Sequence, residues 1–192
     1  MSLFDLNGRV AIITGGNGGI GLGMALGLAS SGASIAIVGR NSEKNKTASK
    51  KLEATGANVI AIEKDVTNDL AGTEVATEVQ NKFGRIDILI NNAGSNIRKR
   101  PEDLSLDEFR WVQDTNLTSA FVFSQAMYPH FKKVGGGKII NIGSMYSLFG
   151  GPVSTAYSVS KGGIVQMTKS MAAAWATDKI QVNAVLPGWI DT

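Results

Sequence analysis

Short apolar runs alternate along the chain with longer stretches in which apolar residues recur every three or four positions. The short runs are rich in Ile and Val, as expected for strands that a sheet buries on both faces. They predict strands at residues 10–14, 34–38, 58–62, 86–90, 138–142 and 181–186. The longer stretches predict helices at residues 21–31, 44–55, 73–83, 106–132 and 156–177, and Ser105 and Glu108 form a capping-box pair at the start of the fourth.

This alternation predicts an α/β fold class, a doubly wound and Rossmann-like parallel sheet with helices on both faces. The expected order of the six strands is 3-2-1-4-5-6. Because no internal repeat and no linker-like tract interrupts the pattern, we expect a single domain over residues 1–192.

The chain ends at Thr192, shortly after the sixth predicted strand and a Pro187–Gly188 turn. A sixth strand without a neighbour exposes backbone groups at its edge and apolar surface on both faces. We therefore expect a domain truncated at its C-terminus, and a natural protein that extends roughly 50–70 residues beyond Thr192 to a common single-domain length.

Composition narrows the classes of function. Apolar residues make up 43% of the chain and charged residues 18%, as in an ordinary globular protein. The formal net charge of +3, with no basic stripe interleaved with aromatic residues, argues against a nucleic-acid partner. The lysine-rich run 42–51 predicts a solvated helix face. No secretion signal and no membrane-length apolar run is visible, so we expect no membrane partner and a cytoplasmic location.

The sequence contains few residues that could serve as thiol nucleophiles or as cysteine and histidine metal ligands. The chain contains no cysteine and one histidine, His130, which excludes a thiolate site and a histidine-rich metal site. We expect no metal, and His130 is expected at the surface near the end of the fourth helix.

The first motif with chemical content follows the first predicted strand, where residues 14–21 read T-G-G-N-G-G-I-G. Gly15 permits a tight turn, Gly19 lets the backbone approach a pyrophosphate, and Gly21 allows close packing of helix on strand. The helix that follows offers N–H groups and the positive end of its dipole to phosphates. The pattern predicts a dinucleotide site, while a tight turn without a ligand is the plainer interpretation.

Five more motifs follow in order: N-N-A-G at 91–94, D-T-N-L at 114–117, I-N-I-G-S at 140–144, Y-S-V-S-K at 157–161 and N-A-V-L-P-G at 183–188. Together with the T-G-x-x-x-G-x-G spacing of the first motif, they resemble the short-chain dehydrogenases/reductases over essentially the whole chain. G-M-A-L-G-L-A at 23–29 and G-K-I-I-N at 137–141 are similar to the branch of that family that acts on gluconate and deoxygluconate compounds.

Three of these residues also fit a reaction on physical grounds. Tyr157 and Lys161 lie four apart, hence on one face of the predicted helix. A neighbouring ammonium favours the phenolate of a tyrosine, whose pKa is otherwise about 10. Ser144 ends a strand at the edge where α/β sheets bind ligands, so that its hydroxyl can bond a substrate oxygen. Singly, each residue also fits a plainer role as a surface side chain or a cap.

The resemblance implies a role for each residue. Tyr157 is implied to be the general acid/base, and Ser144 to polarise the carbonyl of the substrate. Lys161 is implied to lower the pKa of the tyrosine and to bind the ribose hydroxyls. Asn116 is implied to position a water in a proton relay. It also implies a dimer or tetramer of identical chains. The cofactor-binding residues implied are Gly15, Asn17, Gly19, Ile20, Gly21, Arg40, Asp65, Val66, Asn92, Ala93, Gly94, Tyr157, Lys161, Pro187 and Gly188.

The end of the second predicted strand bears on which nicotinamide cofactor binds. NAD enzymes of this fold carry an acidic residue there, which accepts from the ribose hydroxyls. This chain has Gly39 at that position and Arg40 next, so that no carboxylate repels a 2′-phosphate and a guanidinium can pair with it. The sequence therefore favours NADP as the cofactor, with NAD as the alternative. Arg40 also fits a plainer role as a surface charge that binds no ligand.

The substrate is indicated less directly. The cations Arg98, Lys99 and Arg100 follow the N-N-A-G motif and suit a carboxylate. We expect an NAD(P)-dependent oxidoreductase acting on a small polar alcohol or ketone, such as a sugar acid or polyol. A 3-oxoacyl thioester reductase is the first alternative, and a nucleotide-binding sensor or subunit without turnover is the second.

Overall fold

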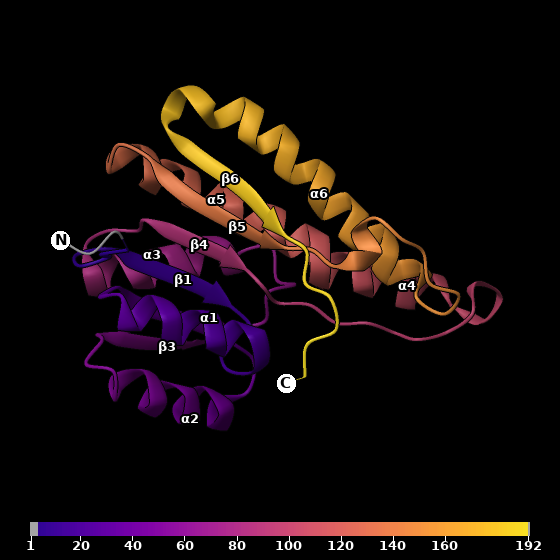
Figure 1. The fold of residues 1–192 in the computed structure, drawn as a ribbon, viewed down its shortest axis with the longest axis horizontal. Helices are drawn as coiled ribbons and strands as arrows, with labels where there is room; N and C mark the ends of the chain where they lie inside the picture. Colours follow the sequence, from indigo (N-terminus) through magenta and orange to yellow (C-terminus); the bar gives the residue numbers. More distant parts are fainter. Residues whose placement is uncertain (1–3, 192) are drawn as a thin grey trace.

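Six parallel strands form one twisted sheet in the computed structural model, which describes residues 4–191 (Figure 1). Their order, β3-β2-β1-β4-β5-β6, is the one predicted, and the observed ends lie within two residues of the expected ones. The strands are β1 (Val10–Thr14), β2 (Ser34–Gly39), β3 (Val59–Glu63), β4 (Ile88–Asn91), β5 (Gly137–Ile142) and β6 (Ile180–Val185).

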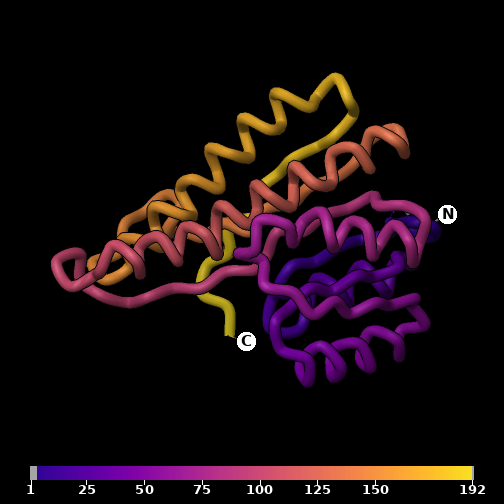
Figure 2. Tube along the Cα trace, turned by 180° about the vertical axis from the view of Figure 1, so that it is seen from behind, coloured from indigo at the N-terminus to yellow at the C-terminus, as the bar shows by residue number. Residues whose placement is uncertain are grey.

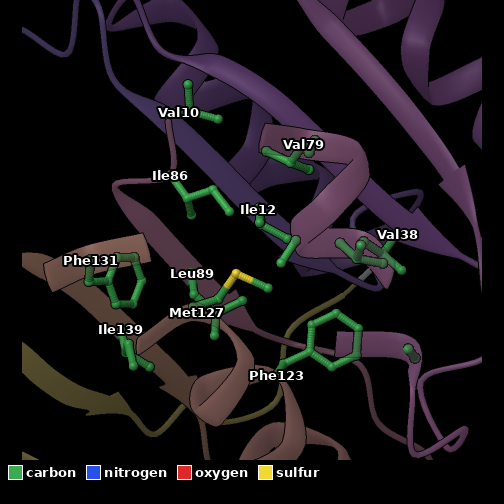
Figure 3. Close-up of a cluster of buried hydrophobic side chains, with 14 of the residues drawn as sticks. Val10, Ile12, Val38, Val79, Ile86, Leu89, Phe123, Met127, Phe131 and Ile139 are labelled. Carbon is green, nitrogen blue, oxygen red and sulfur yellow. The ribbon is translucent and has the colours of Figure 1, made fainter. Parts of the chain in front are cut away.

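Helices cover both faces of the sheet, as the alternating pattern predicts. Apolar side chains of β1 and β2 point to both sides, because consecutive residues of a strand face opposite ways. Ile12 and Val38 pack on one side with Phe123 and Met127 (Figure 3). Ile13 and Ile37, which alternate with them, pack on the opposite side. The helices are α3 (Ala71–Phe83), α5 (Ser119–Lys133) and α6 (Thr155–Trp175) on the first face, and α1 (Gly19–Ser30) and α2 (Ser42–Glu53) on the second.

The helix predicted over residues 106–132 is present and runs without a gap from Leu106 to Lys133, but it is not α-helical throughout. Helix α4 (Leu106–Gln113) starts at the Ser105 capping box, as expected, and is followed by a π-helical segment, η2 (Asp114–Thr118), before α5 begins. The wider turn carries Asn116, whose side chain is only 2% exposed. The wide turn adds one residue and shifts the phase of the apolar spacing only once, a change that a short pattern does not reveal.

The edge strand β6 also differs from its expectation. Ile180 and Val182 are buried, whereas Gln181 and Asn183, which alternate with them, are exposed, so the outward face of this strand is polar over most of its length and apolar at Val185. A strand with one solvated face alternates in this way. The lysines of the 42–51 run are exposed along α2, in agreement with a solvated face. Within residues 4–191, no helix has the length and apolar character needed to cross a membrane.

The loops at one end of the molecule bring distant segments together. The stretch after β4 and the stretch before α6 lie side by side in both views (Figures 1 and 2), and a parallel bridge joins Lys99 to Ser154. Because all strands are parallel, their carboxyl ends meet at one edge of the sheet, and these loops close over it.

Candidate active site

Two adjoining cavities lie at the carboxyl ends of the strands. The first, of about 450 Å³, lies over the glycine-rich loop and is called the Gly19 cavity below. The second, of about 700 Å³, contains Tyr157 and is called the Tyr157 cavity. Asn92, Gly94 and Ser95 line both, so the segment after β4 forms the wall between them.

The glycine-rich loop is fixed to the segment after β4 by hydrogen bonds. Thr14 Oγ1 accepts from the backbone N–H of Asn92 at 3.0 Å and of Ala93 at 3.1 Å. Asn92 Nδ2 donates to the carbonyl oxygens of Thr14 and Gly15, each at 3.1 Å. Gly15 has a φ of +64°, the left-handed conformation that glycine adopts without strain. The turn is therefore fixed by hydrogen bonds between side chains and backbone groups.

The start of helix α1 fits a pyrophosphate. A Cβ at Gly21 would collide with Gly15 O and Asn92 Nδ2, so glycine is required for the helix to pack this close to the loop. The helix begins at Gly19, and its N-cap Gly18 offers no side-chain acceptor to the N–H groups of the first turn. These groups stay available to an anion, which the helix dipole also attracts.

The Asn116 side chain is hydrogen bonded within the protein through both its oxygen and its nitrogen. Its Oδ1 accepts from Ser95 N at 2.7 Å, and its Nδ2 donates to Ser95 O and to Ser160 Oγ, each at 2.9 Å. Ser160, which is fully buried, donates in turn to Tyr157 O at 2.8 Å. The network ties the wall between the cavities, the π-helical segment and helix α6 into one unit. Asn116 faces neither water nor a cavity directly.

Lys161 and Tyr157 lie together on α6, as their spacing predicts. Lys161 Nζ is 5.6 Å from the centre of the Tyr157 ring and donates to Ile142 O at 2.6 Å. Burial lowers the pKa of the Lys161 ammonium to about 8, since a low-dielectric site disfavours the charged form. The ammonium therefore titrates close to neutral pH beside a phenol.

Ser144 stands at the end of β5 as the N-cap of the short helix η3 (Met145–Ser147). Its Oγ accepts from Tyr146 N at 3.2 Å, which leaves the single hydroxyl proton free for an oxygen in the cavity. Its own N–H donates to Ser147 Oγ at 3.1 Å, and Ser147 Oγ donates to Lys161 O at 2.8 Å. Ser144 is thus positioned relative to the same helix that carries Tyr157.

The far end of the Gly19 cavity carries charges. Arg40 Nη1 lies 3.5 Å from Asp65 Oδ2, with both side chains largely in solvent. Burial acts to raise the pKa of Asp65, but hydrogen bonds from Thr67 and the neighbouring Arg40 outweigh it and lower this pKa below its ordinary value. A pair this exposed contributes at most about 1 kcal/mol, so Arg40 can exchange Asp65 for an anionic ligand.

Almost every residue singled out from the sequence lines one of the two cavities. Among the catalytic and cofactor-binding residues, Gly21 and Asn116 are the exceptions, since both support the walls from behind. The Gly19 cavity contains Gly15, Asn17, Gly19, Arg40, Asp65, Val66 and Ala93, the Tyr157 cavity contains Ile20, Ser144, Tyr157, Lys161, Pro187 and Gly188, and both contain Asn92 and Gly94.

Other lining or supporting residues were not singled out from the sequence. Lys44 and Lys64 line the Gly19 cavity, and Tyr146 lines the Tyr157 cavity with its ring centre 6.1 Å from that of Tyr157. Ser160 supports the site from within the Y-S-V-S-K motif. Lys44 belongs to the lysine-rich run 42–51, which was interpreted as a solvated helix face, so its place in the cavity lining was not predicted. The others carry no spacing signal of their own.

The three cations after the N-N-A-G motif are separated by the fold. Arg98 lines the Tyr157 cavity. Lys99 Nζ instead pairs with Glu108 Oε1, and Arg100 Nε with Glu102 Oε1, each at 2.6 Å. Within the described part of the chain, Arg98 is the member of this cluster that can face a ligand there.

A glycine-rich turn beside a tyrosine–lysine pair, at the carboxyl edge of a doubly wound sheet, is the arrangement of a nicotinamide-dependent oxidoreductase of CH–OH and C=O groups. Residues 9–192 match the family model described as short chain dehydrogenase, and the chain belongs to this family.

Named relatives share most of their length with this chain. The 2-dehydro-3-deoxy-D-gluconate 5-dehydrogenase of Escherichia coli is 40% identical, over 100% of this chain and 76% of that protein. A 3-oxoacyl-(acyl-carrier-protein) reductase of Chlamydia pneumoniae is 34% identical, over 97% and 75%. Among solved structures, an NAD⁺-bound xylitol dehydrogenase has a TM-score of 0.94 at 34% identity and covers 97% of this chain and 72% of that one.

Proposed function

We propose that the protein is an NADP-preferring dehydrogenase or reductase of a small polar substrate that carries a carboxylate, such as a sugar acid. The observation that carries the substrate class is the isolation of Arg98 in the Tyr157 cavity, while Lys99 and Arg100 are engaged elsewhere by glutamates. A guanidinium pairs well with a carboxylate in a partly closed cavity. The relatedness to a deoxygluconate dehydrogenase supports the same class.

The proposed roles of the side chains follow from their positions. Ser144 donates to the substrate oxygen, and Tyr157 gives that oxygen a proton or removes one. Lys161 favours the phenolate of Tyr157 and binds ribose hydroxyls, while the Asn116 turn holds a water through which the proton reaches solvent. The bound nicotinamide supplies or accepts the hydride.

NADP is the proposed cofactor because Gly39 brings no carboxylate to the Gly19 cavity and Arg40 brings a cation. Arg40→Ala should weaken NADPH binding by about 1–2 kcal/mol and leave NADH nearly unaffected, since only NADPH carries a 2′-phosphate. Fluorescence titration of the wild type and of Arg40→Ala with NADPH and with NADH measures the dissociation constants. Equal weakening of the two cofactors contradicts the assignment.

Arg98 allows a direct test of the substrate class. The wild type is assayed with sugar acids, neutral polyols and 3-oxoacyl thioesters, and Arg98→Ala is compared with the matched control Arg100→Ala. We expect turnover of a sugar acid, with a KM raised about tenfold or more in Arg98→Ala alone and a smaller change for a polyol. Turnover of a thioester alone favours the reductase related to the Chlamydia pneumoniae protein. Cofactor binding without any turnover favours a sensor or subunit.

We further propose that identical chains associate through α4 and α5. Leu106, Trp111 and Phe121 are exposed apolar side chains on these helices, with Trp111 and Phe121 at 37% and 46% exposure. Large exposed apolar side chains gathered on adjoining helices are typical of association surfaces. Light scattering of wild type and Phe121→Glu tests the assembly. A location in the cytoplasm stays a prediction from the sequence.

A further inference from the structure

The Gly19 cavity has a polar pair at its base that the sequence does not reveal. Asn17, in the glycine-rich loop, donates from Nδ2 to Asn45 Oδ1 on α2 at 2.7 Å. Asn45 Nδ2 donates in turn to Gly39 O, at the end of β2, at 2.9 Å. Asn45 is 4% exposed, so this bond is shielded from water.

Gly39 lies directly beneath this pair. A Cβ at position 39 would collide with Asn17 Nδ2 and would lie 2.9 Å from both Asn17 Cγ and Asn45 Oδ1. The φ of Gly39 is not in the left-handed region, so the backbone itself does not require glycine here. The two asparagine side chains, rather than the local backbone, exclude a side chain at this position.

We propose that the Asn17–Asn45 pair sets cofactor selectivity, by occupying the space that an acidic side chain at position 39 needs to reach the ribose hydroxyls. This inference rests on the proposed preference for NADP and names its steric cause. Arg40 then meets the 2′-phosphate without a competing carboxylate at position 39. Asn45 acts through Asn17 and is a positioning residue for selectivity.

The arrangement has a consequence for substitutions at position 39. Any side chain there must displace Asn17, which breaks its bond to Asn45. Because Asn17 lines the Gly19 cavity, its displacement changes the wall that faces the cofactor. A change at position 39 is therefore expected to disturb the cofactor, whatever its charge, for as long as the Asn17–Asn45 pair is intact.

The steric part of the proposal is tested with Gly39→Ala, which adds a methyl group and no charge. Dissociation constants for NADPH and NADH are measured by fluorescence titration of the full chain. We expect Gly39→Ala to weaken both cofactors about tenfold, and to cost less than about twofold when it is introduced into Asn17→Gly or into Asn45→Ala, because contacting side chains give non-additive effects. Thermal melting of each variant shows whether it is folded. Binding by Gly39→Ala within twofold of the wild type overturns the proposal.

The selectivity part is tested with Gly39→Asp. Alone, it should weaken both cofactors; combined with Asn17→Gly, it should shift the ratio of the two dissociation constants toward NADH by about tenfold or more, because the carboxylate then reaches the ribose and repels the phosphate. An equal shift by Gly39→Asp alone overturns the role of the pair. If wild type prefers NADH, the proposed cofactor is wrong, while the Gly39→Ala measurements still decide whether the pair excludes side chains.

Discussion

The Gly19 cavity and the Tyr157 cavity share one wall, but the side chains around them are held in different ways. Arg40, one of the charged residues that line the first cavity, is 61% exposed and loosely paired with Asp65. At the second cavity, Asn116, Ser160 and Lys161 are at most 4% exposed, and each is hydrogen bonded within the protein. Exposed charges can select a ligand with little effect on the fold, whereas buried groups tie the chemistry to the stability of the domain.

The largest effect expected on the buried side is the loss of the reacting phenol itself. Tyr157→Phe should lower kcat by about 100- to 10,000-fold, the usual contribution of a general acid or base, and change the Kd of NADPH less than about twofold. Steady-state kinetics and fluorescence titration measure the two quantities. Tyr146→Phe, in the neighbouring ring of the same cavity, should lower kcat less than about tenfold. A Tyr157→Phe enzyme within fivefold of the wild-type kcat contradicts the assigned mechanism.

A smaller effect is expected from the hydroxyl that joins Asn116 to Tyr157. Ser160→Ala should lower kcat about 10- to 100-fold with cofactor Kd nearly unchanged, because the Asn116 turn and α6 lose their common anchor and the reacting groups shift by a fraction of an ångström.

The matched control for Ser160 lies two residues away on the same helix. Ser158 Oγ is buried and has no hydrogen-bond partner among the described residues. Ser158→Ala should be neutral or slightly stabilising, since removing an unsatisfied buried hydroxyl costs no bond. Equal losses of kcat in both variants would mean that helix α6 is merely sensitive to truncation, and the positioning role of Ser160 would be wrong.

The same contrast explains how far the sequence could be interpreted. The strand order and the cavity residues were accessible because runs of buried Ile and Val and short motifs are local patterns. The wide turn that buries Asn116 was not, since it depends on Ser95 and Ser160, which are 21 and 44 residues away from it. The Asn17–Asn45 bond joins residues 28 apart and has no periodic signal. Hydrogen bonds between side chains that are distant in the sequence form only in the tertiary structure, so helix and strand propensities do not predict them.

The smallest effect expected is on stability, and it concerns Lys161. Burial lowers the pKa of its ammonium from 10.5 to about 8, which corresponds to a destabilisation of about 3 kcal/mol at neutral pH. Lys161→Met removes this cost but leaves Ile142 O without its donor, a loss of about 1–2 kcal/mol. We expect a net gain of about 1–2 kcal/mol in the free energy of unfolding at pH 7, together with loss of turnover.

The pH dependence of that gain distinguishes relief of a buried charge from better packing. Below pH 8 both folded and unfolded wild type carry the proton, and the full cost of the buried ammonium is present. Between about pH 8 and 10.5 the unfolded chain keeps a proton that the folded chain has lost, so wild-type stability rises with pH relative to Lys161→Met. Urea unfolding without cofactor should therefore show a smaller gain in the free energy of unfolding for Lys161→Met at pH 10 than at pH 7.

Lys169→Met, at an exposed position on the same helix, is the matched control and should show neither a gain in the free energy of unfolding nor a pH dependence. A gain for Lys161→Met that is equal at both pH values would attribute the effect to packing and contradict the buried charge.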